Sequence, residues 1–249
     1  MRYARRRKSI EISAVAINAA LYATLGYMTY LGLFTPVIGV VRFWPAVIVP
    51  GFFSVVYGPL VGGIGAAIGI FISDMLIHGN ALLSLTVGVP ANFLGFYTLG
   101  ALSRRRPSRL LSLLSRIFLV VIAILSLRLH VLISNLDSTI SIVFTVVSIL
   151  SLVAILIVDR LYPDHPNFGT AAVVGLALGS AIIGIGVWAY SQFLVLPTGE
   201  INLPIQAALL WFLWTFITEI PFLVFVVPPL LKAFYKAFPY FTQYATAQR

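Results

Sequence analysis

The chain of 249 residues contains no cysteine and very little charge. Without cysteine, neither disulfides nor thiol chemistry can contribute to its structure or function. Charged residues make up only 9% of the sequence, hydrophobic residues make up 60%, and the mean hydropathy is +1.04. A soluble domain of this length does not need so much apolar surface, so lipid must be part of the solvent. The composition predicts an all-α integral membrane protein with no room for a soluble catalytic domain.

The sequence also lacks the motifs of the common catalytic and cofactor sites. It has no HExxH, no GxSxG, no paired acidic motif and no nucleotide-binding motif. Its three histidines, His78, His130 and His165, fall in different segments. We therefore expect no enzymatic activity, no cofactor, no metal site and no ATP hydrolysis by this chain.

Basic residues outnumber acidic ones by 16 to 7, and they lie beside the apolar runs. They precede the first run, follow the fourth and follow the last: Arg2, Arg5, Arg6, Arg7 and Lys8; Arg104, Arg105, Arg106 and Arg109; Lys232, Lys236 and Arg249. Basic loops stay on the cytoplasmic side, so we predict a cell-membrane protein with an even number of crossings and both termini cytoplasmic. Arg42 and Arg128 are the basic residues expected outside. We expect contact with membrane lipid and none with nucleic acid.

The apolar runs predict about eight crossings, since a crossing needs about 20 apolar residues. They cover about 10–34, 44–57, 60–78, 84–102, 110–128, 139–158, 169–195 and 205–231. The second run is short and is interrupted by Pro50 and Gly51. The fifth and sixth are rich in Leu, Ile, Val and Ser. We predict a single membrane domain, 1–249, in which core helices from 10–105 and 168–235 carry an inserted helical hairpin, 110–160.

Small residues recur at helical spacing in two of the segments. Gly62, Gly65 and Gly69 occupy the third segment, where such spacing lets helix backbones approach closely, so we assign them to helix packing. Ala16 and Ala20 share one face of the first segment. That face suits either packing within the bundle or the docking of another membrane protein.

Polar and aromatic residues gather near the expected outer ends of the core segments. They are Arg42, Trp44, Asp74, His78, Asn80, Asn92, Trp188, Tyr190, Gln192, Glu200, Asn202, Gln206, Trp211 and Trp214. Polar groups in a membrane are costly, and their convergence predicts an outward-opening pocket with aromatic walls. The alternative is an interfacial aromatic belt with ordinary loop polarity.

Two acidic positions have several interpretations. Asp74 and His78, four residues apart, suit a metal, a proton relay, a hydrogen-bonded pair or a helix end-cap. Glu219 is the deepest acid and is expected about 20 Å from the outer end, below a shallow pocket. It could contact substrate, satisfy amides freed near Pro221, or pair with Asn18.

The chain resembles the substrate-binding S components of energy-coupling factor (ECF) transporters, which take up vitamins. The resemblance rests on Ala16-x-x-x-Ala20, on Arg42-Phe43-Trp44-Pro45 and on the run 52–63 with its Gly-Pro turn. It covers about 10–105 and 168–235. It implies a six-helix core, to which the hairpin would add two crossings.

The resemblance also implies a function and partners. An S component binds a small, vitamin-like nutrient from outside and delivers it through a transmembrane coupling protein and two cytoplasmic ATPase subunits. Ala16 and Ala20 would form the docking face. The family pattern points to Arg42, Asn80, Asn92, Trp188, Gln192, Trp211 and Trp214 as substrate-binding residues. Arg42 would attract an anionic group, and the tryptophans would stack on a flat ring.

Two other functions remain open from the sequence. One is a stand-alone proton- or ion-coupled secondary transporter that uses Asp74 and Glu219. The other is a membrane-embedded lipid enzyme that depends on Asp74, His78 or Glu219.

Overall fold

The computed structural model describes residues 2–33, 37–38, 41–105, 108–132, 137–162 and 167–239. The side chains of 2–7, 32–33, 37–38 and 41–42 lie outside this description, as do Arg106, His165 and Arg249. The described part is almost entirely helical, as predicted. The elements in chain order are α1 (Arg2–Met28), η1 (Thr29–Leu33), β1 (Val37–Ile38), β2 (Val41–Arg42), η2 (Pro45–Val47), α2 (Ile48–Val56), α3 (Pro59–Ile77), α4 (Ala81–Leu83), η3 (Ser84–Gly88), α5 (Val89–Ser103), α6 (Arg109–Leu127), α7 (Leu129–Leu132), α8 (Ser138–Leu161), α9 (Phe168–Ser191) and α10 (Gln206–Ala237).

Among the described residues, seven helices are long and apolar enough to cross a membrane, so the chain is a multi-pass membrane protein. The expected run 44–57 forms only η2, of 3 residues, and α2, of 9 residues. At about 1.5–2 Å per residue these reach about 20 Å, which is less than a hydrocarbon core of about 30 Å. The prediction of about eight spanning helices was therefore wrong for this segment. Val37 and Ile38 of β1 pair antiparallel with Arg42 and Val41 of β2 in a short ribbon that precedes it.

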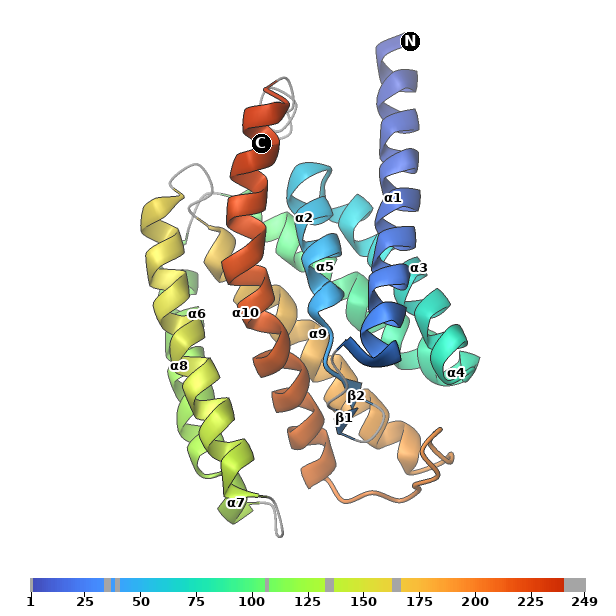
Figure 1. Cartoon of the computed structure of the whole chain (residues 1–249), viewed down its shortest axis with the longest axis vertical. Coiled ribbons are helices and arrows are strands. Elements are labelled where there is room, and N and C mark those ends of the chain that lie inside the picture. Colours follow the sequence, from blue (N-terminus) through green and yellow to red (C-terminus); the bar gives the residue numbers. More distant parts are fainter. Residues whose placement is uncertain are drawn as a thin grey trace.

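The described chain begins and finishes at one end of the bundle (Figure 1). α1 runs away from this end, α2 returns toward it, and the later long helices alternate until α10 comes back. The turn between α2 and α3 lies at the same end, where Arg104 donates hydrogen bonds to the carbonyl oxygens of Val55 (3.1 Å) and Val56 (3.2 Å). These bonds satisfy carbonyls that the end of α2 leaves without helical partners. We call this end, with Lys8, Arg104 and Lys232, the basic end.

Glycines let the core helices approach one another closely. On α3, a Cβ at Gly69 would lie 2.8 Å from the carbonyl oxygen of Ala19, and Gly62 and Gly65 face side chains of α2 and α1. Between α5 and α9, a Cβ at Gly175 would lie 2.6 Å from the carbonyl oxygen of Gly95. The backbones of α1, α3, α5 and α9 are therefore packed more tightly than larger side chains would permit.

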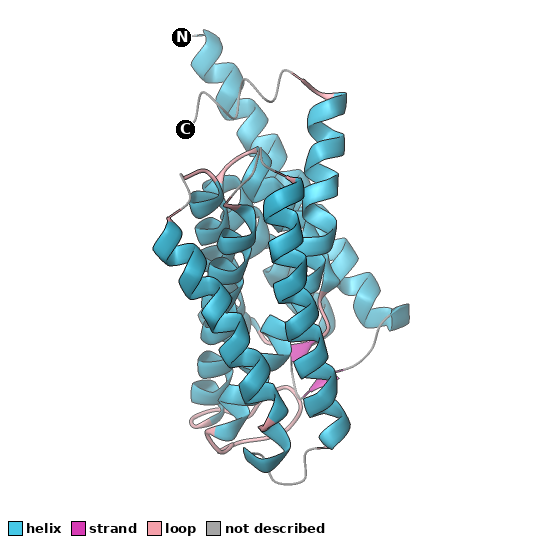
Figure 2. Cartoon of the chain, turned by 90° about the vertical axis from the view of Figure 1, so that its left-hand side faces the viewer, coloured by secondary structure: helices cyan, strands magenta, loops and turns pink. Residues whose placement is uncertain are grey.

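Helices α6 and α8 form an antiparallel pair along one side of the bundle, and they face the viewer in Figure 2. Phe118 of α6 packs edge-on against Phe216 of α10, with ring centroids 5.3 Å apart. Arg116 of α6 forms an ion pair of 2.9 Å with Asp159 of α8, so its head group is held within the pair. Many aliphatic side chains on the outer faces of both helices are exposed, as expected for a surface in contact with lipid.

Candidate functional site

A cavity of about 100 Å³ lies between α1, α3, α5, α9 and α10. Its lining combines acidic, amide, hydroxyl and aromatic groups with aliphatic side chains: Tyr22, Trp44, Ile70, Asp74, His78, Leu83, Val87, Gly88, Asn92, Ile183, Val187, Thr215 and Glu219. This volume is below the roughly 300–1,000 Å³ of pockets that hold drug-sized ligands. In this conformation the cavity accepts a small molecule, or one group of a larger one.

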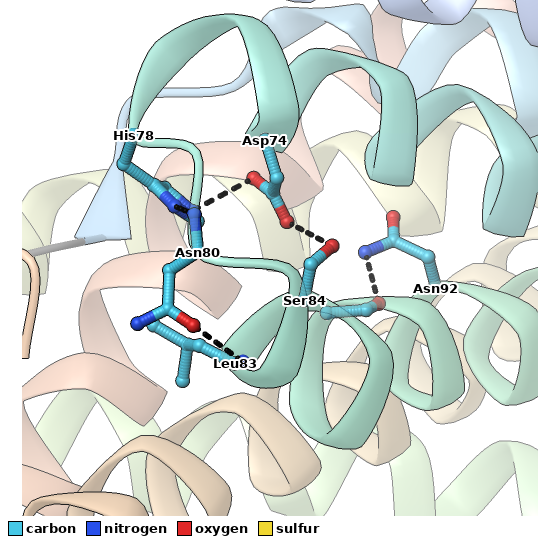
Figure 3. Close-up of polar contacts among 7 residues, drawn as sticks. Asp74, His78, Asn80, Leu83, Ser84 and Asn92 are labelled. Carbon is cyan, nitrogen blue, oxygen red and sulfur yellow. Dashed lines mark hydrogen bonds and ion pairs between the residues drawn. The ribbon is translucent and has the colours of Figure 1, made fainter. Parts of the chain in front are cut away.

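The wall contributed by the end of α3 is a hydrogen-bonded cluster around Asp74 (Figure 3). Ser84 donates its hydroxyl to Asp74 Oδ2 at 2.7 Å, and His78 Nε2 lies 3.4 Å from Asp74 Oδ1. Gly79, with a φ of 69°, turns the chain back so that Ser84 faces the end of α3. Left-handed backbone of this kind favours glycine. The sequence thus brings residues ten positions apart into one polar cluster.

The tautomer of His78 follows from its second nitrogen. The backbone N–H of Asn80 donates to His78 Nδ1 at 3.0 Å. Nδ1 therefore carries no proton, and the proton of the imidazole lies on Nε2, which faces Asp74. Asn80 accepts a hydrogen bond of 2.9 Å from the backbone N–H of Leu83 and so caps the short α4.

Another part of the lining is built by Tyr22, Trp44 and Asn92. The hydroxyl of Tyr22 donates to Asn92 Oδ1 at 2.6 Å, and Asn92 Nδ2 donates to the carbonyl oxygen of Gly88 at 2.9 Å. The rings of Tyr22 and Trp44 meet edge to face, with centroids 6.1 Å apart and planes at 87°. The wide turn of η3 precedes Asn92 and brings Gly88 into the lining.

Glu219 and Thr215 lie one turn apart on α10 and both line the cavity. Glu219 is 7% exposed, and its carboxylate has no hydrogen-bond or ion-pair partner among the residues that the structure describes. The hydroxyl of Thr215, a residue only 1% exposed, also has no partner there. Asn18, one expected partner of Glu219, instead donates to the carbonyl oxygens of Val61 (3.1 Å) and Gly62 (3.3 Å). The cavity thus reaches the depth of Glu219, below the shallow pocket that the sequence suggested.

The predicted binding residues occupy several different environments. Asn92 lines the cavity, and Asn80 lies beside it, bonded to the Tyr190 hydroxyl at 3.1 Å. Trp188 and Gln192 donate to the carbonyl oxygen of Leu203, at 3.1 Å and 3.0 Å, and so hold the loop before α10.

The remaining candidates lie elsewhere. Trp211 is buried away from the lining, and Trp214 packs against Phe144 of the hairpin at 6.0 Å. The side chain of Arg42 lies outside the described residues. Ala16 and Ala20 are exposed on α1.

Sequence reasoning missed Tyr22 and Thr215. The available signal was the spacing of Ala14, Asn18 and Tyr22, which places two polar side chains on one face of an apolar helix. All three are buried in the bundle, whereas Ala16 and Ala20 face outward. A polar residue on the buried face of a membrane helix is a stronger indicator of a cavity than an aromatic residue near a helix end.

Replacing Tyr22 with Phe is expected to lower the melting temperature of the detergent-solubilised protein. The change removes the hydrogen bond to Asn92 and leaves a buried amide oxygen without its donor, which costs about 1–3 kcal/mol. Tyr97→Phe, at an exposed tyrosine on α5, provides the control and should leave the melting temperature unchanged. Equal stability of the Tyr22 variant and the unmodified protein would contradict a structural role for this bond.

Ser84 and His78 both hydrogen-bond to or face Asp74 rather than each other. Ser84 bonds to Asp74 and not to His78, so the imidazole is not placed to take the proton of the hydroxyl. No group of three His, Cys, Asp or Glu residues within the described ranges could hold a metal ion.

A scan against protein-family models found no match for this chain, and searches of the curated proteins and of the solved structures likewise found no similar protein.

Proposed function

We propose that the chain is the substrate-capture subunit of an ECF-type importer, which binds a small organic nutrient from the outer side. The observation that carries the proposal is the polar cavity inside a bundle of membrane-spanning helices, lined by Asp74, Asn92 and Glu219. Such groups are costly in a membrane unless they serve a ligand or one another. The cavity offers directional hydrogen-bonding groups without an arrangement for bond cleavage.

The position of the cavity supports capture from outside. α3 runs from the basic end toward Asp74 and His78, so this wall of the cavity lies toward the opposite end of the bundle. The basic end is the one that its positive charges predict to be cytoplasmic. A ligand would therefore enter from the outer side.

The outer face of α1 supports a membrane partner. Ala16 and Ala20 are exposed, whereas Ala19 and Ala23 of the same helix are buried. An apolar groove of about 530 Å³ between α1, α2 and α10 borders the same helix, with Ile17 in its lining. Exposed small residues beside a groove let another helix approach closely, as the docking of a coupling protein requires.

Replacing Ala16 with Leu is expected to abolish ATP-dependent uptake while leaving ligand binding intact. The larger side chain would separate a docked helix from α1 without reaching the cavity. Uptake of the co-purified ligand into cells, and its binding to the purified variant, would be measured together. Ala233→Leu adds the same bulk at an exposed position of α10 and should transport normally. Normal uptake by the Ala16 variant would exclude this docking face.

A stand-alone ion-coupled transporter is the second candidate, and the buried carboxylate of Glu219 favours it. A carboxylate without a partner inside a membrane bundle can carry a proton or bind a coupling ion. The two functions separate in proteoliposomes that contain this chain alone. Uptake driven by a proton or sodium gradient would establish the second candidate and exclude the first, whereas uptake only with ATPases and ATP would do the reverse.

A further inference from the structure

The charged groups in the described lining of the cavity are acidic. Its lining contains two carboxylates, Asp74 and Glu219, and no lysine or arginine among the described residues. A protonated histidine could offset this negative charge. His78, however, accepts a hydrogen bond on Nδ1 and is therefore neutral. Among the described lining residues, Glu219 therefore has no cationic partner.

The two carboxylates differ in how far the protein satisfies them. Asp74 accepts a hydrogen bond from Ser84 at 2.7 Å and faces the N–H of His78. Glu219 has neither kind of partner, and the hydroxyl of Thr215 one turn away is also unpaired. A buried carboxylate without a partner is strongly destabilising. A ligand that supplies the missing donor would remove this cost.

The aromatic side chains of the lining also favour the binding of a cation. Trp44 and Tyr22 both line the cavity, and their rings meet edge to face. The face of an aromatic ring attracts a cation, and tryptophan does so most strongly.

We infer that the cavity recognises an organic cation that carries N–H donors, a protonated amine or an amidinium, with Glu219 as its counter-ion. Its N–H groups would donate to Glu219 and Thr215, and its cationic group would lie against the ring of Trp44. The volume of about 100 Å³ fits such a head group. This inference rests on the proposed function, because it names the substrate class of the same cavity. It differs from the expectation that an anionic group binds through Arg42, whose side chain lies outside the described residues.

Three probes of the same planar shape but different charge test this inference: acetamidinium, acetamide and acetate. Each is titrated as a chloride or sodium salt, or as the neutral compound, into the purified full chain in detergent at constant ionic strength. Melting temperature and tryptophan fluorescence are the readouts. Acetamidinium should raise the melting temperature and change the fluorescence saturably, whereas acetamide and acetate should do neither. Saturable binding of acetate, or no response to acetamidinium, would overturn the inference.

Glu219→Gln keeps the shape of the side chain and removes its charge. It should weaken acetamidinium binding at least tenfold. Glu200→Gln, at an exposed acid in the loop before α10, is the matched control and should bind like the unmodified chain. Unchanged acetamidinium binding by the Glu219 variant would overturn the role of this residue.

The experiment also separates this inference from the function on which it rests. Acetate binding by a protein that still co-purifies with ATPases would contradict the proposed class of substrate and would be consistent with the importer. Acetamidinium binding that depends on Glu219, in a protein that transports without ATPases, would contradict the importer function and support the proposed class of substrate.

Discussion

Gly175→Ala in α9 is expected to lower the melting temperature by several degrees, although alanine is favoured over glycine in most helices by about 1 kcal/mol. The added methyl group would lie 2.6 Å from the carbonyl oxygen of Gly95 and 2.9 Å from the backbone nitrogen of Leu99. Backbone atoms cannot rotate away, so α5 and α9 must separate. Overpacking of this kind costs about 1–3 kcal/mol, and Gly175→Leu should prevent folding altogether.

Thermal unfolding of the purified protein, followed by fluorescence or size-exclusion chromatography, measures this effect. Ala16→Leu is the control, because it adds three carbon atoms to an exposed face of α1 and should leave the melting temperature unchanged. A Gly175→Ala variant as stable as the unmodified chain, or more stable, would show that the contact between α5 and α9 is looser than described.

Trp44→Ala is expected to reduce ligand affinity at least tenfold, whereas Trp214→Ala should reduce stability and leave affinity unchanged. Trp44 lines the cavity beside Tyr22, while Trp214 packs against Phe144 on the side of the hairpin. Both tryptophans are buried, so each truncation should cost about 3–5 kcal/mol of stability.

Isothermal titration with the co-purified ligand at a temperature where both variants remain folded separates the two residues. Trp44→Phe keeps an aromatic ring and serves as a milder variant in case Trp44→Ala does not fold. It should bind the ligand with intermediate affinity. Equal losses of affinity in Trp44→Ala and Trp214→Ala would show that the ligand site extends toward the hairpin and that the cavity described here is only part of it.

Most of the fold could be predicted from hydrophobic patterning. Long apolar runs specify spanning helices because, in lipid, backbone N–H and C=O groups can hydrogen-bond only to other backbone groups of the same segment. Seven of the expected runs form such helices. The run 44–57 was wrongly predicted to span the membrane because its apolar content is high. Pro45 and the Gly58–Pro59 turn limit its helix to a short segment. Composition alone does not measure how far a helix can extend.

The site could be predicted less well, and the reason is geometric. Trp188 and Gln192 have the residue types of a binding wall, yet the structure uses them to hold the carbonyl oxygen of Leu203. Tyr22 and Thr215 line the cavity because of the rotation of α1 and α10 about their own axes, which depends on the packing of glycines between helices. Asn92 and Asp74 were evident from sequence because polar groups are rare in apolar segments.

The most direct test of the proposed function is mass spectrometry of the tagged protein purified from its native membrane, with proteins and small molecules identified in the same sample. We predict that a membrane coupling protein, ATPase subunits and a bound organic cation that contains nitrogen will co-purify. We also expect Ala16→Leu to lose the protein partners and keep the cation, and Glu219→Gln to keep the partners and lose the cation. Recovery of the chain without ATPases, under conditions that preserve such complexes, would contradict the importer.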